Sequence, residues 1–223
     1  MGGKQVSAVV FDMDGVLFNT EENYQRLVRD FYAELGVCLT NDELWLLPGR
    51  SLQAYLDNFS IWWQRVPRLD EQERAEDPFD RFETWCRGHE TPAIKLMNPG
   101  VPQTLATLAE ADIKVALASS STQEEIAGLI DPVGIRRYFS AVMSGEELAE
   151  SKPNPEIYFR TLACLDVDAR DAVAVEDSDT GIAAARAAGL EVVAKREPRF
   201  GFTQEGATWV IDQVPDLLDI IRI

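Results

Sequence analysis

The stretch Val9-Val10-Phe11-Asp12-Met13-Asp14-Gly15 joins an apolar, strand-like run to two carboxylates that stand two residues apart. Side chains two residues apart on a strand point the same way, so Asp12 and Asp14 can share one site. Crowded carboxylates are costly to ionise together unless a cation lies among them, and Mg2+ is the usual oxygen-seeking ion. The stretch therefore indicates a metal-assisted reaction on an anion, although Asp-x-Asp-Gly alone is also compatible with a solvated turn.

A hydroxyl-rich segment follows a second apolar run, Val115 to Ala118. It reads Ser-Ser-Ser-Thr at residues 119 to 122, and Glu124 stands three residues after Ser121. This pattern predicts a strand that passes into a helix with a capped first turn. Hydroxyls and free backbone N–H groups at such a junction suit a phosphate group.

Two further polar segments belong to the same pattern. Lys152 lies between a serine and a proline, and Glu176 and Asp177 follow the apolar run Val173 to Val175. A helix-like stretch after this acidic pair ends at Gly189, and glycine is typical of helix C-caps. Open parallel sheets place their sites at the carboxyl ends of strands, so we expect these acidic, hydroxyl and lysine side chains to meet there.

In these four motifs the chain resembles the haloacid dehalogenase superfamily of aspartate-nucleophile phosphotransferases. The matching residues are Asp12 to Gly15, Ser119, Lys152, Glu176 and Asp177. The resemblance spans most of residues 5 to 195 and is closest to the β-phosphoglucomutase-like and phosphoglycolate-phosphatase-like members, which carry a helical cap between the first two motifs. An aspartate at position 14 is typical of the phosphoryl-transfer members, so we do not expect dehalogenation.

The resemblance implies a role for each acidic residue, and the chemistry of the side chains agrees. Asp12 would attack phosphorus and form an aspartyl phosphate, while Asp14 would protonate the leaving oxygen and then activate water. Mg2+ would bind the Asp12 carboxylate, the backbone carbonyl of Asp14 and the Asp177 carboxylate. Glu176 would be a direct or water-mediated ligand of the same ion.

Fixed donors would hold the transferring phosphoryl group. Ser119 and Lys152 would contact its oxygens, where charge is stabilised by groups already in place. The backbone amides of Met13 and Ser120 are expected to be further phosphate contacts.

The composition excludes several other classes of protein. With 223 residues the chain is long enough for one sizeable core plus an insertion. A net charge of -17 argues against binding to nucleic acids or anionic membrane surfaces. No apolar run approaches the roughly 20 residues that span a bilayer, and the start lacks a signal-peptide pattern.

The cysteines and the histidine favour a cytoplasmic enzyme without a zinc site. Cys38, Cys86 and Cys164 are scattered and odd in number, so we interpret them as reduced, partly buried thiols. His89 is the only histidine and has no cysteine neighbours at zinc-ligand spacing.

The core is predicted to be a Rossmann-like, doubly wound α/β fold. Apolar runs near residues 6–11, 115–118, 141–144, 172–176, 191–194 and 208–211 alternate with helical patterns. They predict a six-stranded parallel sheet with helices on both faces. This core would comprise residues 1–19 and 95–223, and residues 20–94 would form an inserted helical cap.

Helical patterns support the prediction of the cap. Apolar residues repeat at helical spacing from Tyr24 to Leu35, from Leu52 to Trp63 and from Phe79 to Cys86. Thr40 and Glu43 have the spacing of a capping box. Residues 64–78 are mostly polar, and we predict that they form an exposed linker.

The cap sequence indicates less about the substrate than the four motifs indicate about the reaction. β-Phosphoglucomutases carry a histidine in the first cap helix that assists the mutase step, and the matching position here holds Tyr24. This difference favours a phosphatase, which needs only to admit water, over a mutase, which must protect its aspartyl phosphate. Arg50 follows Gly49 in a predicted loop and is the candidate for contacting the substrate anion, with a solvated charge as the alternative.

We therefore predict a Mg2+-dependent phosphatase that acts on a small phosphorylated metabolite, expected to be a sugar phosphate, as a monomer or homodimer. A sugar-phosphate mutase is the alternative. A signalling phosphoacceptor resembling a bacterial receiver domain is disfavoured, because receivers place their acidic pair before the acceptor aspartate and have no cap insertion.

Overall fold

The computed structural model describes residues 4–47 and 52–222, and the chain divides into two compact units. One unit, called the core here, comprises Met1–Asn19 and Ala93–Ile223, and the other, called the cap, comprises Thr20–Pro92. The division rests on contacts within each unit. The predicted domain bounds, residues 1–19 and 95–223 for the core and 20–94 for the cap, stay a prediction.

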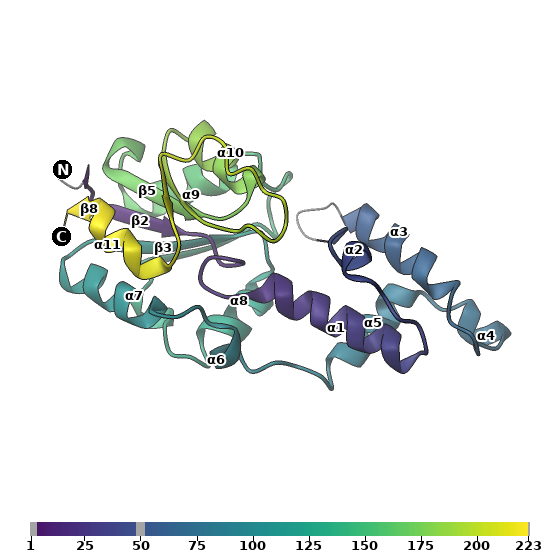
Figure 1. The fold of residues 1–223 in the computed structure, drawn as a ribbon. Coiled ribbons are helices and arrows are strands. Elements are labelled where there is room, and N and C mark those ends of the chain that lie inside the picture. Colours follow the sequence, from purple (N-terminus) through teal and green to yellow (C-terminus); the bar gives the residue numbers. More distant parts are fainter. Residues whose placement is uncertain (1–3, 48–51, 223) are drawn as a thin grey trace. The chain divides into compact units, whose positions relative to one another are not determined.

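A parallel sheet of six strands lies at the centre of the core (Figure 1), with the order β4-β3-β2-β5-β6-β7. The strands are β2 (Ala8–Phe11), β3 (Lys114–Ser119), β4 (Ala141–Ser144), β5 (Ala172–Glu176), β6 (Glu191–Lys195) and β7 (Trp209–Ile211). This order confirms the predicted doubly wound α/β fold. The chain winds from β2 to one side through β3 and to the other through β5, so the strand order reverses at the carboxyl end of β2.

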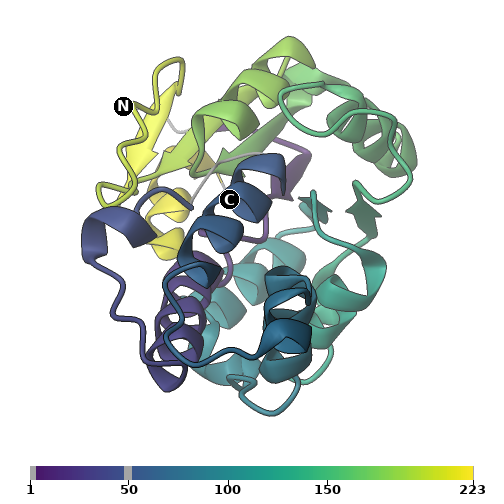
Figure 2. The same cartoon turned by 90° about the vertical axis from the view of Figure 1, so that its right-hand side faces the viewer.

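The alternation of side chains on β2 explains how both faces of the sheet are covered. Val9 and Phe11 lie in one apolar cluster, while Ala8 and Val10 lie in the other. The first cluster contains residues of α7 (Val101–Glu110), α8 (Gln123–Ile130) and α11 (Leu217–Ile220), and the second contains residues of α9 (Glu156–Leu165) and α10 (Asp179–Ala187). The two helical layers can be followed in Figure 1 and, after a turn of 90°, in Figure 2.

Shorter elements complete the core. A two-stranded parallel sheet joins β1 (Lys4–Gln5) to β8 (Ile221–Arg222), near the two ends of the chain. Helix α6 (Ala93–Leu96) follows the cap, and 3-10 turns cover Arg136–Tyr138, Ala169–Asp171 and Val214–Asp216. The backbone N–H of Asn19 donates to the carbonyl of Leu96 at 2.7 Å. This hydrogen bond joins the core segment before the cap to the core segment after it.

Aromatic side chains from three helices form the interior of the cap. Its helices are α1 (Thr20–Glu34), α2 (Asn41–Leu44), α3 (Leu52–Trp63), α4 (Glu71–Arg74) and α5 (Pro78–Cys86). The Phe82 ring centroid lies 5.4 Å from that of Phe31 and 5.1 Å from that of Phe59. Aromatic pairs at this separation add to the stabilisation from burial alone.

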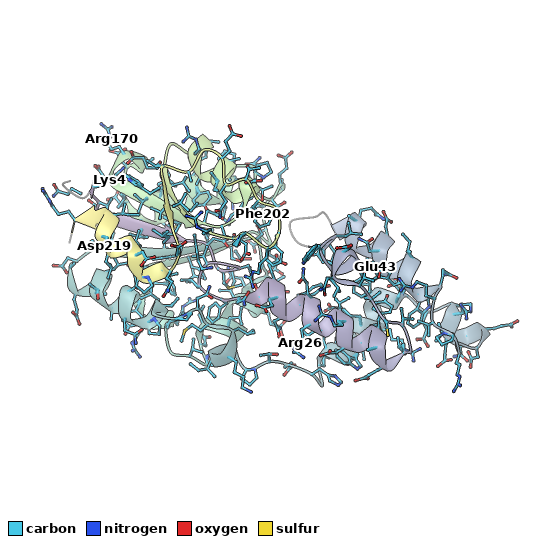
Figure 3. The ribbon with its side chains drawn as sticks, in the orientation of Figure 1. Lys4, Arg26, Glu43, Arg170, Phe202 and Asp219 are labelled. Atoms are coloured by element: carbon cyan, nitrogen blue, oxygen red, sulfur yellow. The ribbon has the colours of Figure 1, made fainter. Side chains whose placement is uncertain are left out.

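The capping box at Thr40 and Glu43 forms as predicted at the start of α2. The Glu43 backbone N–H donates to the Thr40 hydroxyl at 3.2 Å, and the Thr40 backbone N–H donates to the Glu43 carboxylate at 2.8 Å. Figure 3 marks Glu43 on α2 and Arg26 on α1, whose guanidinium pairs with Asp30 of the same helix.

Three details differ from the sequence predictions. Residues 64–78 contain the short helix α4, because Asp70 and Glu73 form a second capping box. The first sheet strand begins at Ala8 rather than near Val6. Cys38 and Cys164 are exposed rather than partly buried.

No helix in residues 4–47 and 52–222 is long and apolar enough to cross a membrane.

Candidate active site

Asp12 is the first residue after β2 and lies where the strand order reverses. Its backbone N–H continues the sheet by donating to the carbonyl of Val175 at 2.9 Å, and its carboxylate is buried. A buried carboxylate needs compensating charge or hydrogen bonds. The structure supplies them from residues that are far apart in the sequence.

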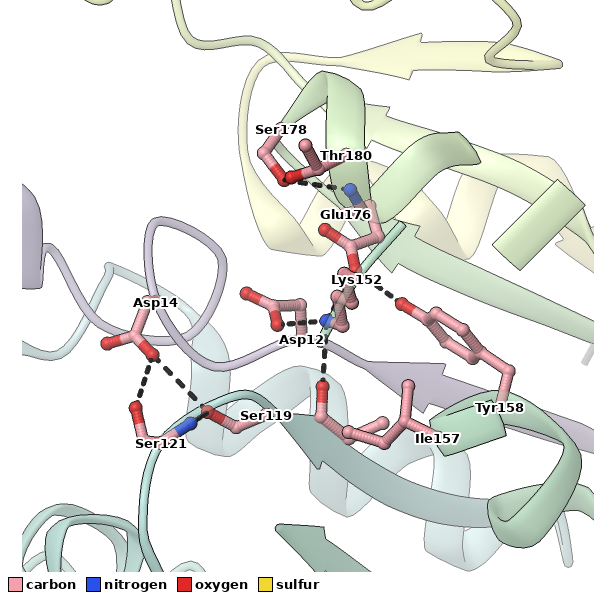
Figure 4. A network of polar contacts seen from close by, with 12 residues as sticks. Asp12, Asp14, Ser119, Ser121, Lys152, Ile157, Tyr158, Glu176, Ser178 and Thr180 are labelled. Carbon is pink, nitrogen blue, oxygen red and sulfur yellow. Dashed lines mark hydrogen bonds and ion pairs between the residues drawn. The ribbon is translucent and has the colours of Figure 1, made fainter. Parts of the chain in front are cut away.

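Lys152 binds Asp12 directly (Figure 4). Its ammonium donates to Asp12 Oδ1 at 2.6 Å, to Glu176 Oε1 at 2.7 Å and to the carbonyl oxygen of Ala118 at 3.0 Å. An ammonium group has three N–H donors, so these acceptors use all of them. The structure thus brings Lys152, predicted to bind phosphate, onto the predicted nucleophile.

Burial changes the acidity of this pair. Burial raises the pKa of Asp12 to about 8, the Lys152 ammonium opposes the increase, and the carboxylates of Glu176 and Asp14 add to it. For Lys152, burial lowers the pKa, but the charges of Asp12 and Glu176 outweigh burial and hold the pKa well above its usual range. Lys152 therefore keeps its charge, and further positive charge near Asp12 would favour the ionised form of its carboxyl group.

The second acidic pair lies beside Asp12. Glu176 ends β5, Asp177 follows it, and both are buried. One carboxylate oxygen each from Asp12, Glu176 and Asp177 lie within 4.8 Å of one another. Glu176 Oε2 has no hydrogen-bond partner among the described residues. Buried oxygens of this kind are the ligands that Mg2+ prefers, so the residues present fit the expected metal ion.

Gly15 makes room for this acidic group. Its φ is +77°, and a Cβ atom at this position would lie 1.9 Å from Asp177 Oδ2. A side chain would strain the backbone and displace the Asp177 carboxylate. The glycine of the first motif thus allows the first and fourth motifs to approach each other.

Asp14 turns away from the three clustered carboxylates. Its Oδ2 accepts hydrogen bonds from the hydroxyls of Ser119 at 3.3 Å and Ser121 at 3.0 Å (Figure 4). The Asp14 carboxylate is therefore held on the serine side of the site. Its predicted roles as proton donor and backbone metal ligand stay predictions.

The helix cap is one residue later than predicted. Thr122, not Ser121, is the N-cap of α8: its hydroxyl accepts from the Glu125 N–H at 3.2 Å, and the Glu125 carboxylate accepts from the Thr122 N–H at 2.8 Å. Ser121 is thereby released from capping, and its hydroxyl binds Asp14 instead. The spacing of Thr122 and Glu125 is an equally visible capping-box signal in the sequence, and it leaves Ser121 without a capping role.

The remaining predicted contacts lie outside this network or are not described. Met13 is buried and Ser120 is exposed, and their contacts with phosphate stay predictions. Arg50 falls outside the described residues. Within the cap, the ring centroid of Tyr24 lies 5.7 Å from that of Tyr55 and 5.5 Å from that of Phe82.

Tyr158 is a site residue that sequence reasoning missed. It lies on α9, is fully buried, and its hydroxyl donates a hydrogen bond to Glu176 Oε1. Burial and the negative charge of Glu176 raise the pKa of Tyr158 well above its usual range, so the phenol keeps its proton. No motif marks this residue, because an apolar helix position gives no sign of where a phenol hydroxyl points.

Comparison with known proteins supports the resemblance seen in the sequence motifs. A model of the haloacid dehalogenase-like hydrolases matches residues 9–195. A protein of Thermotoga maritima named phosphorylated carbohydrates phosphatase is 31% identical over 194 residues, which cover 83% of each chain. The β-phosphoglucomutase of Bacillus subtilis is 28% identical over 216 residues, covering 95% of this chain and 92% of the relative.

A solved structure shares the fold. CbbY from Rhodobacter sphaeroides, crystallised in complex with phosphate, superimposes with a TM-score of 0.69 at 27% identity, covering 94% of this chain and 95% of the other. The chain therefore belongs to the haloacid dehalogenase-like hydrolase family and is an enzyme similar to its β-phosphoglucomutase-like and phosphatase members.

Proposed function

We propose that the protein is a Mg2+-dependent phosphohydrolase that releases phosphate from a sugar phosphate through an aspartyl phosphate on Asp12. The observation that carries the proposal is the placement of Asp12. It is buried at the end of the central strand, bound by Lys152, and lies within 4.8 Å of the Glu176 and Asp177 oxygens.

The first step would transfer the phosphoryl group to Asp12. A carboxylate oxygen of Asp12 attacks phosphorus, and the bond between phosphorus and the leaving oxygen breaks. Asp14 gives its proton to that oxygen. Lys152 already lies against Asp12, so its ammonium can stay close to the transferring phosphoryl oxygens and offset their charge.

The second step would return Asp12 to its starting state. Asp14, now ionised, takes a proton from water, the water oxygen attacks phosphorus, and the bond to Asp12 breaks. Ser119 and Ser121 bind the Asp14 carboxylate in the structure, and they would hold it between the two proton transfers.

The carboxylates of Asp12, Glu176 and Asp177 would hold Mg2+. When bound, this ion supplies positive charge that favours the ionised form of Asp12 and neutralises the phosphoryl oxygens. The raised pKa of Asp12 supports this assignment, because Lys152 alone does not return the pKa of this carboxyl group to its usual range.

Two observations support a sugar-phosphate phosphatase. The Thermotoga maritima relative is named for phosphorylated carbohydrates. In addition, Tyr24 is packed between aromatic rings, and burial raises the pKa of its hydroxyl well above the usual range of tyrosine, so it is a poor substitute for an acid–base histidine. The name of the Bacillus subtilis relative keeps a mutase as the second candidate. A cytoplasmic location and a monomeric or homodimeric state stay predictions.

A screen of sugar phosphates with Mg2+ tests the proposal, with inorganic phosphate and isomer formation measured in the same samples. A phosphatase releases one phosphate for each substrate consumed and needs no sugar bisphosphate as primer. Conversion of β-glucose 1-phosphate to glucose 6-phosphate faster than phosphate appears, with priming required, would instead assign the mutase activity.

A further inference from the structure

The carboxylate of Glu176 is enclosed by three groups from different parts of the core. Tyr158 and Lys152 both donate hydrogen bonds to Oε1, and Oε2 faces Gly181. A Cβ atom at Gly181 would lie 2.0 Å from Oε2, so the helix leaves the carboxylate no space on that side. The direction of the Glu176 carboxylate is therefore set by its surroundings.

Tyr158 has the position and chemistry to set that direction. It follows Lys152 by six residues, on the first turn of α9, and its side chain belongs to the apolar cluster that α9 and α10 form against one face of the sheet. The Lys152 ammonium lies 5.3 Å from the centroid of the Tyr158 ring, a distance at which a cation is attracted to the ring face. One side chain thus contacts both partners of the Lys152–Glu176 ion pair.

The phenol hydroxyl binds a charged acceptor although neutral acceptors would satisfy it. Tyr32 in the cap is an equally buried tyrosine, and its hydroxyl donates to the backbone carbonyl of Phe59 at 2.9 Å. A hydrogen bond to an ionised carboxylate is stronger than one to a carbonyl and constrains the carboxylate more tightly. Side chains that orient metal ligands in this way typically change metal affinity about 10- to 100-fold when altered.

We propose that Tyr158 is a positioning residue, which orients the Glu176 carboxylate for Mg2+ and keeps Lys152 directed at Asp12. The inference rests on the proposed function, since it takes Glu176 as part of the metal site. Tyr158 itself contacts no reacting atom.

Calorimetry of Mg2+ binding to the metal-free protein tests the proposal without relying on activity. Tyr158→Phe removes the hydroxyl and keeps the ring, and we expect it to raise the Kd for Mg2+ about tenfold. Tyr32→Phe is the matched control: it removes a buried phenol hydroxyl in the cap and should leave the Kd unchanged. Circular dichroism establishes that both variants are folded.

A double-mutant cycle shows whether the hydroxyl acts through Glu176. In a Glu176→Ala background, Tyr158→Phe should change the Kd less than twofold, because the carboxylate that it orients is gone. Equal effects in both backgrounds, or a Tyr158→Phe Kd within twofold of the wild type, would overturn the proposal.

Gly181→Ala gives a second test that leaves Tyr158 intact. The added methyl group must displace the Glu176 carboxylate from the side of Oε2, so we expect weaker Mg2+ binding in this variant as well. An unchanged affinity for Mg2+ would contradict the claim that its neighbours set the direction of the Glu176 carboxylate. A wild type that binds no Mg2+ would overturn the metal assignment along with this inference. If the wild type shows Mg2+-dependent phosphatase activity and Tyr158→Phe leaves the Kd for Mg2+ unchanged, only the inference about Tyr158 is overturned.

Discussion

At the scale of single residues, the site depends on how the charge of Asp12 is balanced. Its carboxylate is buried, bound to Lys152 and close to the oxygens of Glu176 and Asp177. Burial raises the pKa of Asp12 to about 8, although the Lys152 ammonium opposes the increase. Further positive charge, which a metal ion would provide, is therefore expected to favour the ionised form of Asp12, the proposed nucleophile.

The raised pKa of Asp12 makes stability depend on pH. Aspartate in an unfolded chain titrates near a pH of about 4, so the folded protein binds an extra proton between that pH and about 8. The stabilising contribution is complete below the lower value and is lost as the pH rises through the higher one. In metal-free buffer, we expect the Tm of Asp12→Asn to rise relative to the wild type as the pH increases across this interval. A difference in Tm that is independent of pH would show that Asp12 is ionised throughout.

The two acidic residues of the fourth motif should differ in their effect on the metal. Asp177→Ala should weaken Mg2+ binding more than Glu176→Ala, because Asp177 is predicted to bind the ion directly. The Glu176 carboxylate, by contrast, also accepts hydrogen bonds from Lys152 and Tyr158. Titration of each metal-free variant with Mg2+ measures this order. Unchanged affinity in both variants would make the acidic pair purely structural.

At the scale of the elements, the junction between β3 and α8 places a helix-capping residue beside a candidate site residue. Thr122 caps the helix, and the adjacent Ser121 binds Asp14. The same division of labour occurs after β5, where Ser178 caps α10 and Glu176 and Asp177 belong to the site. The candidate site residues thus lie at the strand ends, and capping residues begin the helices that follow.

Substitution of the two neighbouring hydroxyl residues tests this division. Thr122→Ala should lower the free energy of unfolding by about 1 kcal/mol and leave kcat unchanged, because it removes only an N-cap. Ser121→Ala should lower kcat with little loss of stability, because Asp14 loses the hydrogen bond from the Ser121 hydroxyl and keeps the one from Ser119. Denaturant unfolding and steady-state kinetics measure both effects, and an exchange of the two results would contradict the assignment.

At the scale of the whole molecule, patterned apolar segments made most of the fold predictable. The strands of the six-stranded sheet are mainly apolar runs, and the major cap helices show helical spacing of large side chains. Helix α4 was not predicted because its four residues are polar and depend on the cap formed by Asp70 and Glu73. Tyr158 was not predictable, since its role depends on a contact with Glu176 that only the packing of α9 against the sheet creates.

Trapping the phosphorylated enzyme tests the central claim most directly. Asp14→Asn should form the aspartyl phosphate slowly and hydrolyse it more slowly still, because the side chain can no longer take a proton from water. The variant is mixed with Mg2+ and a sugar phosphate that the wild type hydrolyses, quenched in acid and mapped by mass spectrometry. We predict one phosphoryl group on Asp12, absent when Asp12→Asn is added. A phosphoryl group on another residue, or full phosphate release by the Asp12→Asn variant, would contradict the account.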